Sequence, residues 1–206
     1  MVDPETVIDW NNVETKLFEL CVHAIKNVKF KDPNEKIHAF VLDMTAERGE
    51  IFLSADTFAG LEKRAQSAVK DSVTNALALK QYRWSSGDYD HMLFSETDPF
   101  WTAQWDQGLS IEIEAKFQAA FDWLWTRKKN GELTEAKFDL IWEDQIKERF
   151  RRFVCRVTFK LFHSNVFSTW PLTDDFAILA LDHHDPDTHA LERQAKVWKS
   201  CSELKI

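Results

Sequence analysis

Apolar residues recur at helical spacing in the first part of the chain. After Asn11 or Asn12, either of which can cap a helix, they repeat every three or four positions. They are Val13, Leu17, Leu20, Cys21, Ala24, Ile25 and Val28. Pro33, in the segment DPNEK, disfavours a continuation of this helix. The pattern therefore predicts a first helix that ends before Pro33.

Three short segments are apolar in the manner of strands. Residues 37–44, IHAFVLDM, place apolar side chains on both faces, which is typical of a central strand. The turn TAERG follows, and EIFLSA (residues 50–55) is predicted to pair with the first strand as a hairpin. Residues 176–182, FAILALD, are again apolar on both faces and predict a third strand, after a loop STWPLTDD.

Further helices are predicted between and after these strands. One begins at Thr57 and extends to about Leu79, and a short helical turn is expected near Pro99. A long helix begins around Leu109 and ends at the Asn130-Gly131 signal. Thr134 opens a helix with an apolar stripe made of Phe138, Ile141, Trp142, Ile146, Phe150, Phe153 and Val157. With only five Gly and five Pro in the chain, one α+β domain spanning residues 1–206 is predicted, with helices packed on a small sheet.

Composition and charge narrow the class of protein. The 206 residues are 44% hydrophobic and 29% charged, as in soluble globular proteins. The net charge of −8 argues against nucleic acid or an anionic membrane as the main partner. The N-terminus lacks the pattern of a secretion signal, and the three cysteines are scattered, which favours reduced thiols in the cytoplasm.

The interval from Trp84 to Ala115 contains no Lys or Arg and interleaves aromatic with acidic residues. Aromatic anchors ringed by carboxylates suit capture of a basic protein partner. The candidate partner-binding residues are Trp84, Asp88, Tyr89, Asp90, Glu96, Asp98, Trp101 and Trp105. The alternative is that these aromatic rings fill the core beneath a long loop.

A second cluster, Asp182 to His189, raises the question of a metal site. Its candidate ligands are Asp182, His183, His184 and Asp185, with His189 nearby. Adjacent histidines point in different directions in a strand or a helix, so they converge only in an irregular turn. Asp185 as an N-cap with Pro186 at the first helical position accounts for the same residues. We therefore expect helix capping here and no metal or other cofactor, and keep the metal site as an alternative.

Other recognisable chemistry is sparse. The chain contains none of the motifs GxSxG, HExxH, GxxxxGK[ST] or GxGxxG. Cys155 lies among arginines, which can activate a thiol, but its apolar neighbours favour a buried core cysteine. Glu112 and Glu114 could act as an acid–base pair, but on an acidic protein such residues usually form a solvated face. Asp43, at the end of a buried strand, is a lone acid–base candidate or a turn cap.

Three segments resemble a bacterial family described only as domain of unknown function 4303. They are KIHAFVLDMTAERGEIFLSADTFAGLEKRAQ, YRWSSGDYDHMLFSE and FAILALDHHDPDTHALERQAKVWK. The chain departs from the family with Ser86, Asp88 and Tyr89 where Pro, Glu and Trp are usual, and with Asp56 where Asn is common. The resemblance implies a cytoplasmic bacterial α+β protein without an established reaction, of a kind that includes immunity proteins and accessory proteins beside toxins.

Three functions are compatible with these patterns. We expect a cytoplasmic binding protein, most specifically an immunity-type inhibitor that neutralises a bacterial toxin with a basic surface. The first alternative is a metal-dependent or acid–base enzyme that uses the Asp/His cluster at 182–189. The second is a homo-oligomeric accessory protein; a monomer and a small homo-oligomer are both compatible with the sequence.

Overall fold

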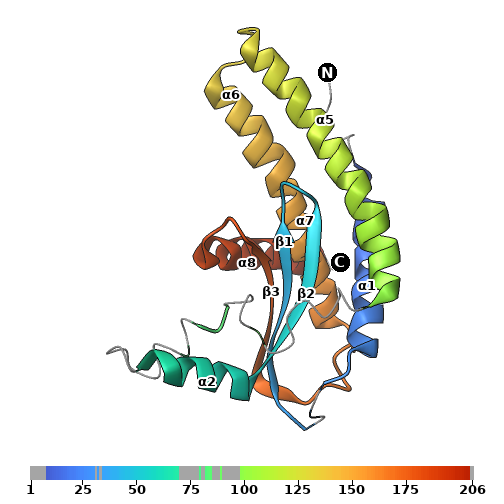
Figure 1. Ribbon diagram of the computed structural model, residues 1–206, viewed down its shortest axis with the longest axis vertical. Coiled ribbons are helices and arrows are strands. Elements are labelled where there is room, and N and C mark those ends of the chain that lie inside the picture. Colours follow the sequence, from blue (N-terminus) through green and yellow to red (C-terminus); the bar gives the residue numbers. More distant parts are fainter. Residues whose placement is uncertain are drawn as a thin grey trace.

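A computed structural model describes residues 8–30, 32, 34–69, 79, 82–84, 89 and 98–204 (Figure 1). Its elements, in chain order, are α1 (Trp10–Asn27), β1 (Ile37–Thr45), β2 (Glu50–Thr57), α2 (Phe58–Val69), α4 (Pro99–Trp101), η3 (Thr102–Leu109), α5 (Ser110–Lys129), α6 (Glu135–Asp139), η4 (Leu140–Lys147), α7 (Glu148–His163), β3 (Leu172–Asp182) and α8 (Asp187–Leu204). The segments η3 and η4 are π-helical. This arrangement confirms the predicted α+β class.

The three strands form one sheet in the order β2-β1-β3. β1 pairs antiparallel with β2 and parallel with β3, so the predicted hairpin and the predicted central strand are confirmed. β3 begins at Leu172, four residues before the predicted start, because Leu172 already pairs with Ile37. The register then shifts, and pairing resumes between Ala39 and Ala177. The polar residues in this irregular stretch are typical of a loop, which is why the sequence predicted a later start for the strand.

Helix α8 covers one edge of β3 with a side chain. The Gln194 amide nitrogen donates to the Ile178 carbonyl at 2.7 Å, and its oxygen accepts from the Ala180 amide at 2.8 Å. A strand edge with unpaired backbone groups invites pairing with another chain. Gln194 therefore protects the part of β3 that β1 does not cover.

Both faces of the sheet are buried, in two cores of different size. On one face, Phe40 and Leu42 of β1 pack into the main core with side chains from α1, α5 and α7. The Trp10 ring lies at the centre of that core, 5.4 to 6.4 Å from the rings of Phe117, Phe150 and Phe153. The opposite face carries a smaller core made of Ala39, Val41, Tyr89, Leu179, Leu181 and Ala190.

One helix boundary differs from the sequence-based prediction. The cap of α1 is Asp9, whose carboxylate accepts from the Asn12 amide at 3.2 Å, and not Asn11 or Asn12. Helix α2 is described as far as Val69, and most of its predicted extension to Leu79 lies outside the described residues. The predicted end of α5 is confirmed, with Asn130 as its C-cap.

Helices α5 and α6 run antiparallel and form an arm that projects beyond the sheet (Figure 1). Thr134 caps α6 as predicted, by accepting from the Lys137 amide at 3.3 Å. The apolar stripe that follows continues through η4 into α7. Aromatic rings join the two sides of the arm, because Phe121 lies 5.7 Å from Phe138 and 5.0 Å from Trp142.

We expect Gly49→Ala to lower the free energy of unfolding by about 2–5 kcal/mol. Gly49 has a φ of +67°, and an added Cβ would collide with the side chain of Ile113 on α5. Gly131→Ala is the matched control, because Gly131 also has a positive φ (+73°) but has no atom within 4 Å of the added Cβ. It should cost only about 1–2 kcal/mol. Urea denaturation measures both, and equal losses would contradict the proposed collision.

Candidate functional site

The structure buries three of the aromatic rings that the sequence offered as partner anchors. Trp101 is 1% exposed, Trp105 is 0% exposed and Tyr89 is 4% exposed. The two indoles lie on one side of the α4–η3 segment, 5.9 Å apart, and belong to the main core. The expectation of exposed anchors is therefore wrong for these three rings, since they fill the interior.

Of the other predicted contact residues, Asp98 and Trp84 have structural contacts of their own, and the rest are not described. Asp98 caps α4, because one carboxylate oxygen accepts from the amides of Phe100 (2.9 Å) and Trp101 (3.4 Å). Its other oxygen lies 3.8 Å from Nε2 of His23 on α1. Trp84 is half-buried against the smaller core. Asp88, Asp90 and Glu96, which were also predicted to contact the partner, lie outside the described residues.

A groove of about 440 Å³ lies between α1 and the segment from α4 to the start of α5. It is lined by Lys16, Glu19, Leu20, Phe100, Ala103, Gln104, Gly108, Leu109 and Glu112. Leu20 and Leu109 are buried, whereas the Phe100 ring is 46% exposed. The groove thus combines an apolar base, an available aromatic ring and two exposed carboxylates, Glu19 and Glu112.

Sequence reasoning missed this groove. Glu112 was assigned to a solvated face, and Phe100 and the residues from α1 were not considered as site residues. Gln104 adds a side-chain amide to the lining of the groove. The ammonium group of Lys116 donates a hydrogen bond of 2.7 Å to Glu112 and so holds the pKa of Glu112 below its usual range. The groove depends on the pairing of two segments that are distant in the chain, and no local pattern encodes that pairing.

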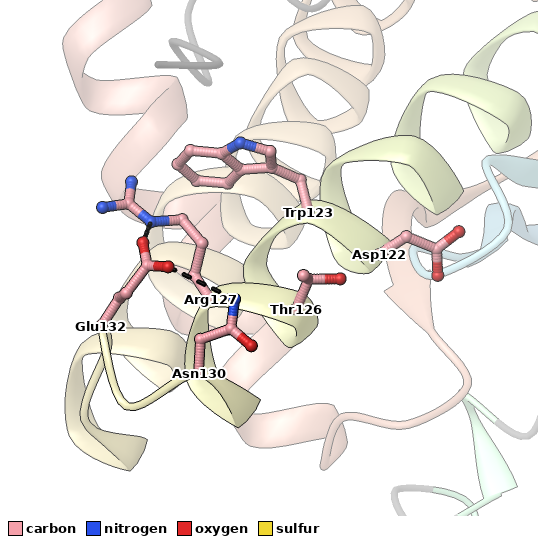
Figure 2. A pocket seen from close by; sticks show the side chains of 6 residues that line it. All are labelled: Asp122, Trp123, Thr126, Arg127, Asn130 and Glu132. Carbon is pink, nitrogen blue, oxygen red and sulfur yellow. Dashed lines mark hydrogen bonds and ion pairs between the residues drawn. The ribbon is translucent and has the colours of Figure 1, made fainter.

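A second hollow lies at the end of α5, at the tip of the arm (Figure 2). The Arg127 guanidinium lies 4.7 Å above the Trp123 ring and donates to Glu132 at 2.9 Å. Asn130 donates to the same carboxylate at 3.4 Å (Figure 2). Because Arg127, the one cation among the described residues that line the hollow, is already paired, we interpret this cluster as a support for the turn between α5 and α6.

The Asp/His cluster lies at the carboxyl ends of β1 and β3, an edge where α/β proteins often bind ligands. Asp182 is 1% exposed and accepts from Arg151 at 2.6 Å. Asp185 accepts from Arg193 and lies 3.7 Å from Arg151. Arginine therefore holds both carboxylates that were candidate metal ligands. Among the described residues, no group of three or more His, Cys, Asp or Glu side chains could hold a metal ion.

The start of α8 differs from the predicted arrangement with Asp185 as N-cap and Pro186 at the first helical position. Helix α8 begins at Asp187, after Pro186, and the Asp185 carboxylate is engaged by arginine. Asp182 has the local role instead, since its second oxygen accepts from the His184 amide at 3.1 Å. His184 itself is exposed.

His183 forms a pair with the carboxylate of Asp43. Its Nδ1 lies 3.2 Å from an Asp43 oxygen, and its backbone N–H donates to the Met44 carbonyl at 3.0 Å. The Asp43 side chain is 5% exposed and the His183 side chain is 59% exposed. A buried carboxylate beside an accessible imidazole is an arrangement capable of general acid–base chemistry.

A buried polar cluster that the sequence did not indicate lies at the opposite end of β1. His38 Nε2 lies 2.5 Å from Asp56 of β2, and Arg64 of α2 donates to the same carboxylate. The Tyr89 phenol donates to the Arg83 carbonyl at 2.6 Å, and burial raises the pKa of Tyr89, with a further contribution from Asp56. His38 and Asp56 are almost fully buried, so we interpret this cluster as the attachment of α2 to the sheet.

The cysteine thiols are poor candidates for chemistry. Cys155 is fully buried, and this burial raises its pKa to about 12. Burial also raises the pKa of Cys21 and of Cys201. The interpretation of Cys155 as a core cysteine is confirmed.

We expect Arg151→Met to lower the free energy of unfolding by about 3–5 kcal/mol, because it leaves the buried Asp182 carboxylate without its partner. Arg152→Met is the matched control, since the Arg152 side chain is 57% exposed and should cost less than about 0.5 kcal/mol. The double variant Arg151→Met/Asp182→Asn should recover part of the loss. Urea denaturation at neutral pH measures all three, and similar stabilities for the two single variants would contradict this account.

Residues 17–196 match the family model described as Domain of unknown function (DUF4303). No curated protein and no solved structure matches the chain. Within the described part of the chain, no helix is long and apolar enough to cross a membrane.

Proposed function

The chain belongs to this family of unknown function, and we propose that it is a binding protein that captures a protein partner in the groove between α1 and η3. The observation that carries the proposal is the Phe100 ring, 46% exposed beside the buried Leu20 and Leu109. Binding energy at protein interfaces concentrates in a few apolar and aromatic anchors, and the surrounding residues mainly exclude water. Phe100 has the position of such an anchor.

The charge of the groove favours a basic partner. Glu19 and Glu112 line it and are exposed, and Lys16 is the one cation among the described residues that line it. The whole chain carries a net charge of −8, and the interval from Trp84 to Ala115 supplies no Lys or Arg. Opposite charge speeds encounter and rejects wrong partners, while apolar contacts supply most of the affinity.

A more specific version of this proposal is that the protein confers immunity to a toxin. In it, the protein acts in the cytoplasm as an immunity-type inhibitor and occludes a bacterial toxin domain whose surface is basic. The carboxylates of the groove support this form, because an inhibitor of a cationic enzyme must carry charge opposite to that of its target. Trp84, Asp88, Asp90 and Glu96 remain predicted contacts in addition to Phe100.

A second candidate function is acid–base catalysis at the Asp43–His183 pair. The specific observation in its favour is the 3.2 Å contact between a buried carboxylate and an imidazole that is largely in solvent. Such a pair positions a histidine for proton transfer, provided that a substrate binds beside it. The exposed His184 is next in sequence. Glu47, two residues after the end of β1, forms an ion pair of 3.0 Å with Lys147 of η4.

The groove proposal predicts that Phe100→Ala weakens partner binding by roughly 30-fold, which corresponds to about 2 kcal/mol. In this proposal the partner is a toxin domain encoded by a neighbouring gene; the purified domain is the ligand, and isothermal titration calorimetry measures its affinity. The charge reversal Glu19→Lys/Glu112→Lys should weaken binding further and reduce its dependence on salt.

Phe162→Ala is the matched control for this experiment, because Phe162 is also 46% exposed but lies on α7. It should bind as the wild type does. The proposal fails if Phe100→Ala and Phe162→Ala bind equally well, provided that their thermal unfolding curves coincide.

The catalytic alternative predicts hydrolysis that depends on His183. Wild type and His183→Asn are assayed with p-nitrophenyl acetate, p-nitrophenyl phosphate and bis(p-nitrophenyl) phosphate over pH 5–9, and His163→Asn serves as the control. Activity that His183→Asn loses and His163→Asn keeps supports the alternative, with an expected loss of about 100-fold or more for a general acid–base residue. No turnover, or equal turnover by the two variants, discards it.

A further inference from the structure

The outward face of α5 carries a seam of residues at heptad spacing. Successive members are separated by four and three positions in alternation, as in helices that pack along their length. The seam consists of Ile111, Ala115, Gln118, Asp122, Trp125 and Lys129, and all six are exposed. Ile111 and Trp125 are two of the large apolar side chains left at the surface, 55% and 38% exposed. Helix α5 runs along the outer side of the molecule (Figure 1).

We propose that this seam is a self-association surface, and that its occupant is the α5 helix of a second copy of the chain. The two helices pack antiparallel about a two-fold axis near residue 120. Such an interface is isologous, so each contact occurs twice with the roles of the two copies exchanged. The seam must then be complementary to its own reversed sequence, a condition that can be checked residue by residue.

The apolar positions meet this condition by size. In the antiparallel pairing, Ala115 lies opposite the partner's Trp125, so the small side chain leaves space for the large indole. The Trp125 ring is held in place within the chain, because it stacks on Phe121 with an interplanar angle of 10° and lies 6.0 Å from the Phe138 ring of α6, and the Lys129 ammonium lies 5.4 Å from its centroid. At the ends of the seam, Ile111 lies opposite the partner's Lys129, whose aliphatic stem can cover it.

The polar positions meet the condition by hydrogen bonding. Gln118 donates to Asp122 of its own helix at 2.8 Å, through one amide hydrogen and one carboxylate oxygen. In the pairing, Gln118 lies opposite the partner's Asp122. The second amide hydrogen and the second carboxylate oxygen are then in position for the same bond across the axis. These bonds would fix the register of the two helices.

Charge along α5 is complementary in the same antiparallel sense. Glu112 lies in the first turn, and Arg127, Lys128 and Lys129 lie in the last turn. Reversal of the second helix brings Glu112, which pairs with Lys116 of its own helix at 2.7 Å, opposite the partner's Lys128, which pairs with Glu135 of its own chain at 2.5 Å. A parallel arrangement would instead place like charges together, so the charges favour the antiparallel dimer.

The expected dimer is weak. Helix α5 has 20 residues and is therefore about 30 Å long. Contact along a single helix pair buries less surface than a stable interface of about 1,200–2,000 Å². The dissociation constant of the dimer should therefore be micromolar or higher. The seam positions 115, 118, 122, 125 and 129 do not line the groove, so this proposal can fail while the groove proposal survives, and the converse also holds.

Sedimentation equilibrium from about 1 µM to about 1 mM tests the proposal. The wild-type mass should rise with concentration towards twice that of the chain. Ala115→Glu places a charge where the partner's indole packs, and Lys129→Glu removes a basic end of the seam. Both substitutions are at exposed helical positions, where a change of side chain usually costs little stability, so folding should be retained. Each should raise the dissociation constant at least tenfold.

Matched controls lie on α8, where Ala195 and Lys199 are exposed. Ala195→Glu and Lys199→Glu introduce the same changes of charge away from the seam and should dimerise as the wild type does. A wild-type protein that stays monomeric at the highest concentration overturns the proposal. A dimer that the α5 variants leave unchanged, or that the α8 variants also abolish, overturns it as well.

Discussion

The burial of β1 on both faces is the constraint on which the rest of the structure depends. Apolar side chains occupy both its odd and its even positions, so the strand is stable only where both faces of the sheet are removed from water. Three strands cannot achieve this alone. Helices α1, α5 and α7 cover one face, and α8 with Tyr89 covers the other. The small sheet therefore acts as the partition between two cores.

The same constraint explains why so many charged groups at the strand ends are paired internally. Asp182 ends β3 beside the core and is neutralised by Arg151, and Asp56 ends β2 and is shared by His38 and Arg64. A buried carboxylate without a partner would cost several kcal/mol, so these pairs are a condition of folding. His183 differs from them, because it is paired with a buried carboxylate while most of its own ring remains in water.

The surfaces available to other molecules consequently lie on the helices. The groove beside α1 and the seam on α5 adjoin at Glu112, the first acidic residue of α5. A partner seated in the groove and a second copy on the seam would both approach this carboxylate. Because the two contacts share this edge, self-association and partner capture are expected to be linked, and each would alter the apparent affinity of the other.

The sequence by itself determined the elements and the fold class. Residues 37–44 could be identified as the central strand because an uninterrupted apolar run must be buried on both sides, and the helices of the arm followed from the Asn130-Gly131 stop and the Thr134 cap. Cys155 could be placed in the core from its apolar neighbours. Each of these inferences uses information carried by residues that are close in the chain.

Tertiary structure alone decided which aromatic rings face inward. Trp101, Trp105 and Phe100 belong to one stretch without Lys or Arg, and nothing local distinguishes the two buried indoles from the half-exposed phenyl ring. The contact of η3 with α1 makes that choice. The partner of Asp182 was equally hidden, because ion pairing depends on distance in space and Arg151 reaches it from a different helix. Packing between distant segments, which periodicity does not encode, thus fixed the surface that the protein presents.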